Sequence, residues 1–256
     1  MVILAIFVFH CTRFFDTDDW SLKNSTTYIA FDVWKQFATS WGMPLILVIS
    51  GASAYLALEK VKPLKYIQGI VARLFLPLML GIFTHVAFQV YLENLHKGKF
   101  QGSFIQFYPH YFEGMYGFGG NFAWMGLHLW YLELLFFLSL ICLPVFLFLK
   151  MTRPGRSLLN GVGNLLAVPG GVILFALPPI YLIRTLDPAT WGNKDLGGWS
   201  VIIYLCFFVS GFIIIASEKL QQRIRQTRWF SLGMGVVLTV IDFFLDFQTI
   251  SMPLQQ

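Results

Sequence analysis

The chain has 256 residues, of which 57% are hydrophobic and 12% charged, and its net charge is +5. Soluble domains carry about a quarter charged residues, so this composition excludes a water-soluble enzyme. It predicts an all-α polytopic transmembrane bundle in a single membrane-embedded domain over residues 1–256. We expect no nucleic-acid partner, because the basic residues are confined to short segments between apolar runs.

Seven apolar runs approach the roughly 20 residues of helix that cross a bilayer. They span about 1–15, 37–58, 74–92, 122–149, 165–184, 199–217 and 230–250. The chain is therefore expected to cross the membrane about seven times, with the lipid bilayer as its first partner. The cysteines at 11, 142 and 206 lie inside apolar runs without metal-ligand spacing, so we expect small core residues and no metal site.

Three alternate connections hold eleven of the 18 basic residues: 59–73, 150–164 and 218–229. Most acidic residues lie in the other connections. Because cytoplasmic loops of membrane proteins are enriched in Lys and Arg, we expect these three segments on the cytoplasmic side. The expected location is the plasma (inner) membrane, with the remaining loops outside.

Two further sequence features leave a choice between packing and function. The external loop at about 93–121 is rich in Gly and aromatic residues, which suits either interfacial packing or stacking on sugar rings. The sequences VISG (48–51) and FFVSG (207–211) each place a Ser-Gly pair within a span. Small residues at a helix crossing account for both pairs without any chemistry.

Ionisable side chains within spans are costly, and each is a functional hypothesis. His10 lies in the first span, one turn before Arg13. Its imidazole is either a general base for a hydroxyl group or an interfacial histidine bonded to a neighbouring helix. His85 and Gln89 share one helical face in the third span, which Glu93 extends, so a packing network is expected there.

The fourth and last spans hold further polar side chains. His128 and Glu133 are five residues apart, a spacing that does not stack them on one helix face, and Trp130 lies beside His128 as at a membrane interface. Asp242 and Asp246 are one turn apart in the last run, where they are expected to face an interior cavity or the outer interface.

Four segments taken together resemble a known family. These are the first-span His10, MPLILVISGASAYL at 43–56, ARLFLPLMLG at 72–81 and HLWYLELLFF at 128–137. In this order and spacing they resemble the acyltransferase-3 family of multi-span membrane acyltransferases over essentially the whole chain. The closest resemblance is to the branch that contains the periplasmic glucan succinyltransferases.

The resemblance implies an O-acyltransferase with cytoplasmic acyl-CoA as donor substrate and no bound cofactor. The implied acceptor is a hydroxyl of an extracytoplasmic carbohydrate. His10 matches the essential first-span histidine, Ser50 and Gly51 match an SG motif, and Arg73 matches a basic position entering the third span. These three, His10, Ser50 and Gly51, are the expected catalytic residues. The expected substrate-binding residues are Arg73, His85, His128, Trp130 and Glu133.

The chain departs from the family pattern at two places. The family usually has a second arginine at the position of Ile70. It also usually has an arginine before the first-span histidine, at a position that would lie ahead of Met1 in this sequence. The family fold also has more than seven spans, so we expect a sequence incomplete at both ends. Two alternatives remain open. One is a transporter or flippase that uses His85, Gln89, Asp242 and Asp246 as a polar pathway, and the other is a non-catalytic fragment. The oligomeric state is left open.

Overall fold

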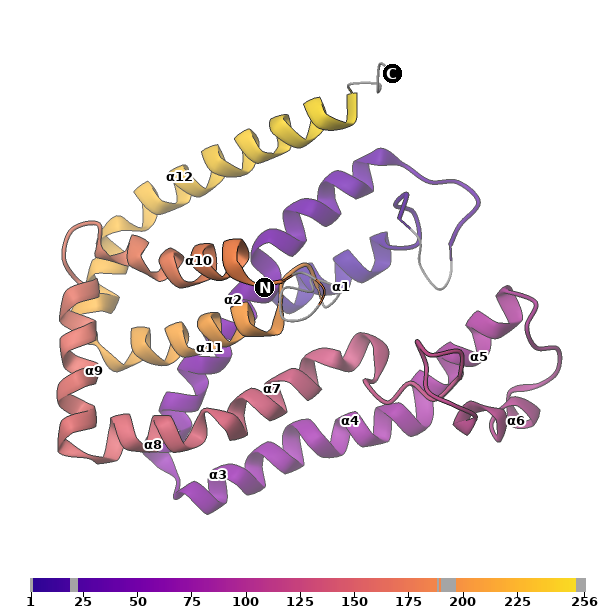
Figure 1. Cartoon of the computed structure of the whole chain (residues 1–256), viewed down its shortest axis with the longest axis horizontal. Helices are drawn as coiled ribbons and strands as arrows, with labels where there is room; N and C mark the ends of the chain where they lie inside the picture. Colours follow the sequence, from indigo (N-terminus) through magenta and orange to yellow (C-terminus); the bar gives the residue numbers. More distant parts are fainter. Residues whose placement is uncertain (1, 19–22, 188, 190–196, 252–256) are drawn as a thin grey trace.

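A computed structural model describes residues 2–18, 23–187, 189 and 197–251, and within these ranges the chain is helical without any β-strand. The helices lie mostly along one direction, and α9 (Arg153–Leu166) runs across the ends of its neighbours (Figure 1). The expected all-α bundle is confirmed. Its apolar helices make this a membrane-embedded protein.

Among the described residues, two helices are long and apolar enough to cross a membrane alone. The first is α2 (Ile29–Lys60). The second runs without a break from Pro63 to His96. Within it, α3 (Pro63–Ile70), α4 (Leu76–Gly81) and α5 (Ala87–His96) are joined by the π-helical turns η1 (Val71–Phe75) and η2 (Ile82–Val86).

In the same described ranges, three further helix pairs reach spanning length only if each bent pair counts as one span. In the first pair, η4 and α7 (Leu127–Ile141) meet α8 (Leu143–Met151) at a bend of 46°. In the second, α9 meets η5 and α10 (Gly171–Thr185) at 114°. In the third, α11 (Val201–Ala216) meets α12 (Glu218–Ser251, counted here to Ile241) at 104°. The described chain thus has two to five candidate spans, and the expected seven are not confirmed. The described part of α1 (Val2–Thr12) is about 17 Å long at 1.5 Å per residue, short of the hydrocarbon thickness.

The three basic connections are largely helical. Segment 59–73 contains the end of α2 and the start of the second long helix, 150–164 is mostly α9, and 218–229 is the first part of α12. They also lie together at one end of the bundle. Lys150 Nζ lies 3.6 Å from a Glu59 carboxylate oxygen, and Arg223 Nε donates a hydrogen bond to the Ala167 carbonyl (2.9 Å). The positive charge is therefore concentrated at one end, which we call the basic end.

The centre of the bundle is the crossing of α2 and α11. A Cβ atom at Gly51 would lie 1.8 Å from the Phe208 carbonyl oxygen, and one at Gly211 would lie 1.9 Å from that of Val48. Only glycine allows the two backbones to approach so closely. The interpretation of the two Ser-Gly pairs as a helix crossing is confirmed. Next to it, Phe212 stacks on Phe146 with ring centroids 3.8 Å apart.

At the end opposite the basic end, residues 97–126 fold into a compact unit against α5. Its aromatic side chains pack mainly on one another, and Phe107 and Tyr111 are fully buried. The Tyr111 hydroxyl donates a hydrogen bond to the Ile82 carbonyl (3.0 Å), and burial raises the pKa of Tyr111 to about 12. Most of the aromatic residues in this loop therefore serve its own packing.

Candidate active site

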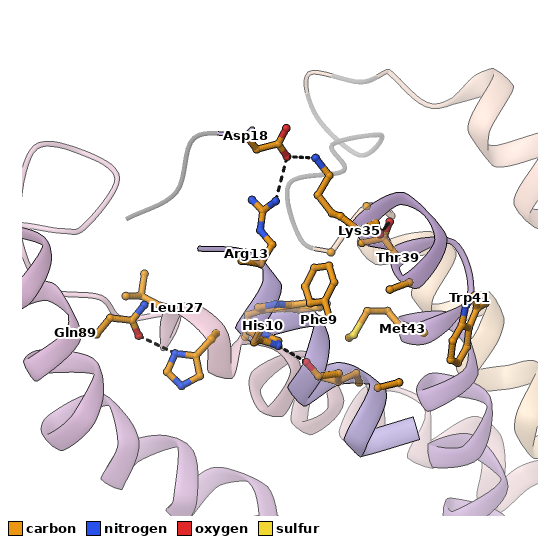
Figure 2. A pocket seen from close by; sticks show the side chains of 18 of the residues that line it. Phe9, His10, Arg13, Asp18, Lys35, Thr39, Trp41, Met43, Gln89 and Leu127 are labelled. Carbon is orange, nitrogen blue, oxygen red and sulfur yellow. Dashed lines mark hydrogen bonds and ion pairs between the residues drawn. The ribbon is translucent and has the colours of Figure 1, made fainter. Parts of the chain in front are cut away.

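A cavity of about 490 Å³ opens between α1, α2, α5, η4 (Leu127–Leu129) and α7 (Trp130–Ile141). Figure 2 shows this cavity, with His10 placed between Gln89 on one side and Met43 and Trp41 on the other. Its other walls come from Tyr116 in the 97–126 unit and from the loop before α11. The lining combines a histidine pair with aromatic rings, which suits a polar substrate that has flat apolar faces. The lining residues are Ala5, Ile6, Phe9, His10, Arg13, Asp18, Lys35, Ala38, Thr39, Trp41, Gly42, Met43, Gln89, Tyr116, Leu127, His128, Trp130, Gly197 and Gly198.

His10 lies on α1 with its ring half-buried. Its Nδ1 is 2.9 Å from the carbonyl oxygen of Ile6, one turn earlier on the same helix. A carbonyl can only accept, so Nδ1 donates and carries the proton in the neutral ring. This hydrogen bond leaves the lone pair on Nε2, which gives His10 the tautomer of a general base.

His128 is held in a comparable way from the opposite wall. Its Nδ1 lies 2.8 Å from Oε1 of Gln89, and since the amide oxygen accepts, Nδ1 is the donor. The ring of His85 lies next to it, with centroids 5.4 Å apart. His85 and Gln89 were expected on one helical face. Both contact His128, so the three side chains form one polar cluster.

An ion-pair network closes one side of the cavity. Asp18 accepts from Arg13 (3.2 Å) and from Lys35 (2.5 Å), while the buried Asp16 pairs with both Arg13 and Lys23. The Lys35 hydrogen bond, with the charges of Lys35 and Arg13, holds the pKa of Asp18 below its usual range. The network joins the end of α1 to the start of α2 and so holds the helix that carries His10 against α2.

The structure brings some of the expected site residues together and places others elsewhere. His10, His128 and Trp130 line the cavity, and His85 touches the ring of His128. Ser50 instead shares a hydrogen bond of 2.7 Å with the Tyr131 hydroxyl. Gly51 lies at the α2–α11 crossing.

Arg73 and Glu133 are not among the cavity-lining residues. Arg73 is exposed in the π-helical turn η1, and Glu133 is half-buried on α7. His85 lies in the other π-helical turn, η2. Such turns often occur at functional sites, because the extra residue re-aims the side chains of that turn. Asp242 and Asp246, expected to face a cavity or the outer interface, have side chains outside the described residues.

Several cavity residues were not predicted from the sequence, among them Lys35, Trp41, Tyr116 and the Gly197–Gly198 pair. Gly197 has φ +69°, and a Cβ there would lie 2.8 Å from the Trp130 ring, so the loop can reach the cavity only with glycine. For Lys35 alone, the sequence held a local hint: it lies three residues after Asp32 near the start of α2, a spacing at which the two side chains can pair. The others come together only through tertiary packing. Among the described residues, no group of three His, Cys, Asp or Glu side chains could hold a metal ion.

Comparison with known families decides what kind of protein this is. A family model described as an acyltransferase domain, Acyl_transf_3, matches residues 1–252. The chain belongs to the acyltransferase-3 family. This acyltransferase is thus a membrane enzyme of the family that the four sequence segments resembled. No curated protein and no solved structure matches it at a significant level.

Proposed function

We propose that this acyltransferase moves an acyl group from cytoplasmic acyl-CoA to a hydroxyl of an extracytoplasmic glycan, with His10 as general base. The observation that carries the proposal is the His10–Ile6 hydrogen bond inside a cavity that also holds His128. That bond leaves Nε2 able to take a proton, and the cavity offers room for an acceptor beside it. The branch resemblance favours a glucan as acceptor.

The chemistry follows from these groups. His10 Nε2 removes the proton from the acceptor hydroxyl as its oxygen attacks the thioester carbonyl carbon. The carbon–sulfur bond then breaks, the CoA sulfur leaves and takes up a proton, and an ester remains on the sugar. His128 has its own Nε2 in the same cavity, where it can orient the hydroxyl. General-base catalysis of this kind contributes about 10²–10⁴ in rate.

The distribution of charge supports the orientation. The cavity lies away from the basic end, where Lys150 and Arg223 are found. Since basic segments favour the cytoplasm, the cavity would face the opposite side, where an envelope glycan is available. Trp41, Trp130 and Tyr116 around it supply flat apolar faces of the kind on which sugar rings stack. Exposed Arg73 and the nearby lysines would meet the CoA phosphates on the cytoplasmic side.

Glycan-dependent release of CoA tests this function. The purified chain in proteoliposomes is given acyl-CoA on the side of the basic end and a glucan on the other side. A transferase releases free CoA only when both substrates are present, and the glucan gains ester groups. A transporter or flippase would release none, and this outcome would overturn the proposal.

A further inference from the structure

A second cavity, of about 560 Å³, lies at the basic end between the end of α9 and the first turns of α12. Two cations, Lys219 and Arg223, line it from successive turns of α12. Three amide side chains, Asn164, Gln222 and Gln226, complete its polar lining. No carboxylate is among the lining residues. This cavity is separate from the one that holds His10, and it has no part in the chemistry proposed above.

The walls of this cavity are fixed by contacts between the two helices. Arg223 Nε donates to the Ala167 carbonyl (2.9 Å), which holds the guanidinium against the end of α9. A Cβ at Gly163 would come within 2.7 Å of the Ser217 side chain, so α9 packs tightly on the corner between α11 and α12. The cation is therefore positioned before any ligand arrives, which reduces the entropic cost of binding.

The charge of this cavity is not balanced within the described chain. Neither Lys219 nor Arg223 forms an ion pair with any acidic side chain there, and only Nε of Arg223 is used by the Ala167 contact. Two terminal guanidinium nitrogens and an ammonium group are thus available as donors. Planar guanidinium donors match the oxygen atoms of phosphate, and amide groups add neutral hydrogen bonds.

We propose that this cavity binds a phosphate group, carried either by an anionic lipid headgroup or by a soluble phosphate compound. The inference stands apart from the proposed acyl transfer. A chain that fails to acylate a glycan could still bind phosphate here, and the reverse also holds.

The test uses the double variant K219Q/R223Q. The matched control is R225Q/R228Q, which removes two charges from the same helix at positions that do not line the cavity. Two probes distinguish the sources. Native mass spectrometry counts phosphatidylglycerol retained from nanodiscs that also contain phosphatidylcholine. Pyrophosphate titration of detergent-purified protein follows the thermal unfolding midpoint.

We expect at least one probe to bind the wild type and R225Q/R228Q with equal affinity. The same probe should bind K219Q/R223Q more weakly, by roughly tenfold for each cation removed. Retained phosphatidylglycerol identifies a lipid site, and stabilisation by pyrophosphate alone identifies a soluble ligand. Equal losses of binding in both double variants would show only a general attraction of the anionic probe to positive charge, and would overturn the proposal. So would the absence of binding by either probe. An unchanged elution profile on size exclusion shows that each variant is folded.

Discussion

Gly51 lies so close to Phe208 that a Cβ atom would come within 1.8 Å of its carbonyl oxygen, and this contact joins the two central helices. Gly51→Ala must therefore push α2 and α11 apart. Overpacking costs about 1–3 kcal/mol, and a backbone clash belongs at the upper end. We expect a clear fall in the thermal unfolding midpoint in detergent. Gly69→Ala is the control, since a Cβ there meets nothing within 4 Å. Equal midpoints for the two variants would contradict this account of the crossing.

The Ser50–Tyr131 hydrogen bond (2.7 Å) links α2 to α7. Ser50→Ala and Tyr131→Phe should each lose stability, and the double variant should lose little more than either alone. The coupling expected from this double-mutant cycle is about 1 kcal/mol. Ser53→Ala is a matched control, because Ser53 bonds only to Ile49 within its own helix. Loss of acyl transfer in Ser50→Ala at unchanged stability would instead support the catalytic role expected from the SG motif.

Gln89 orients the ring of His128 through the hydrogen bond between Oε1 and Nδ1. Gln89→Leu removes the acceptor and frees the ring, so kcat should fall by about a hundredfold, as for other misplaced catalytic groups. Gln89→Glu keeps an acceptor oxygen and should retain more activity. Gln68→Leu, at an exposed position of the same long helix, serves as the control. If Gln89→Leu matched the wild type in steady-state kinetics, His128 would have no role in orienting the acceptor.

Asp18 should make the stability of the fold depend on pH in the acidic range. Its pKa is lowered in the folded chain by Lys35 and Arg13, so the carboxylate stabilises the fold fully above its unfolded pKa of about 3.9. The contribution is lost as the pH falls through the lower, folded pKa. Asp18→Asn should therefore be less stable than the wild type at neutral pH, and the difference should shrink as the pH falls below about 3.9 and vanish below the folded pKa. Thermal unfolding at pH 3, 5 and 7 measures it, with Asp187→Asn as control. A difference that persists unchanged at pH 3 would exclude this charge effect.

The sequence allowed the helical bundle and a helix crossing at each Ser-Gly pair to be predicted, because apolar length and Ser-Gly pairs are local signals. It did not reveal the breaks around Cys142 and at Ser217, nor that the basic connections are themselves helical. Those features depend on how helix ends pack against their neighbours. His10 and His128 could be named as candidates because ionisable side chains are unusual in apolar runs, and Trp130 because it lies in the HLWYL segment that resembles the family. Their meeting in one cavity with Lys35 and Tyr116 depends on contacts across the whole chain.

The central claim is that His10 Nε2 takes the proton of the acceptor hydroxyl. Its most direct test is the O-acyl content of the acceptor glycan, measured by mass spectrometry in cells that express His10→Ala. The control is His110→Ala, which removes an exposed histidine of the 97–126 unit that pairs with Glu113. We predict that His10→Ala lowers acylation by about 10²–10⁴ while the protein still inserts into the membrane, and that His110→Ala acylates normally. Normal acylation by membrane-inserted His10→Ala would contradict the mechanism.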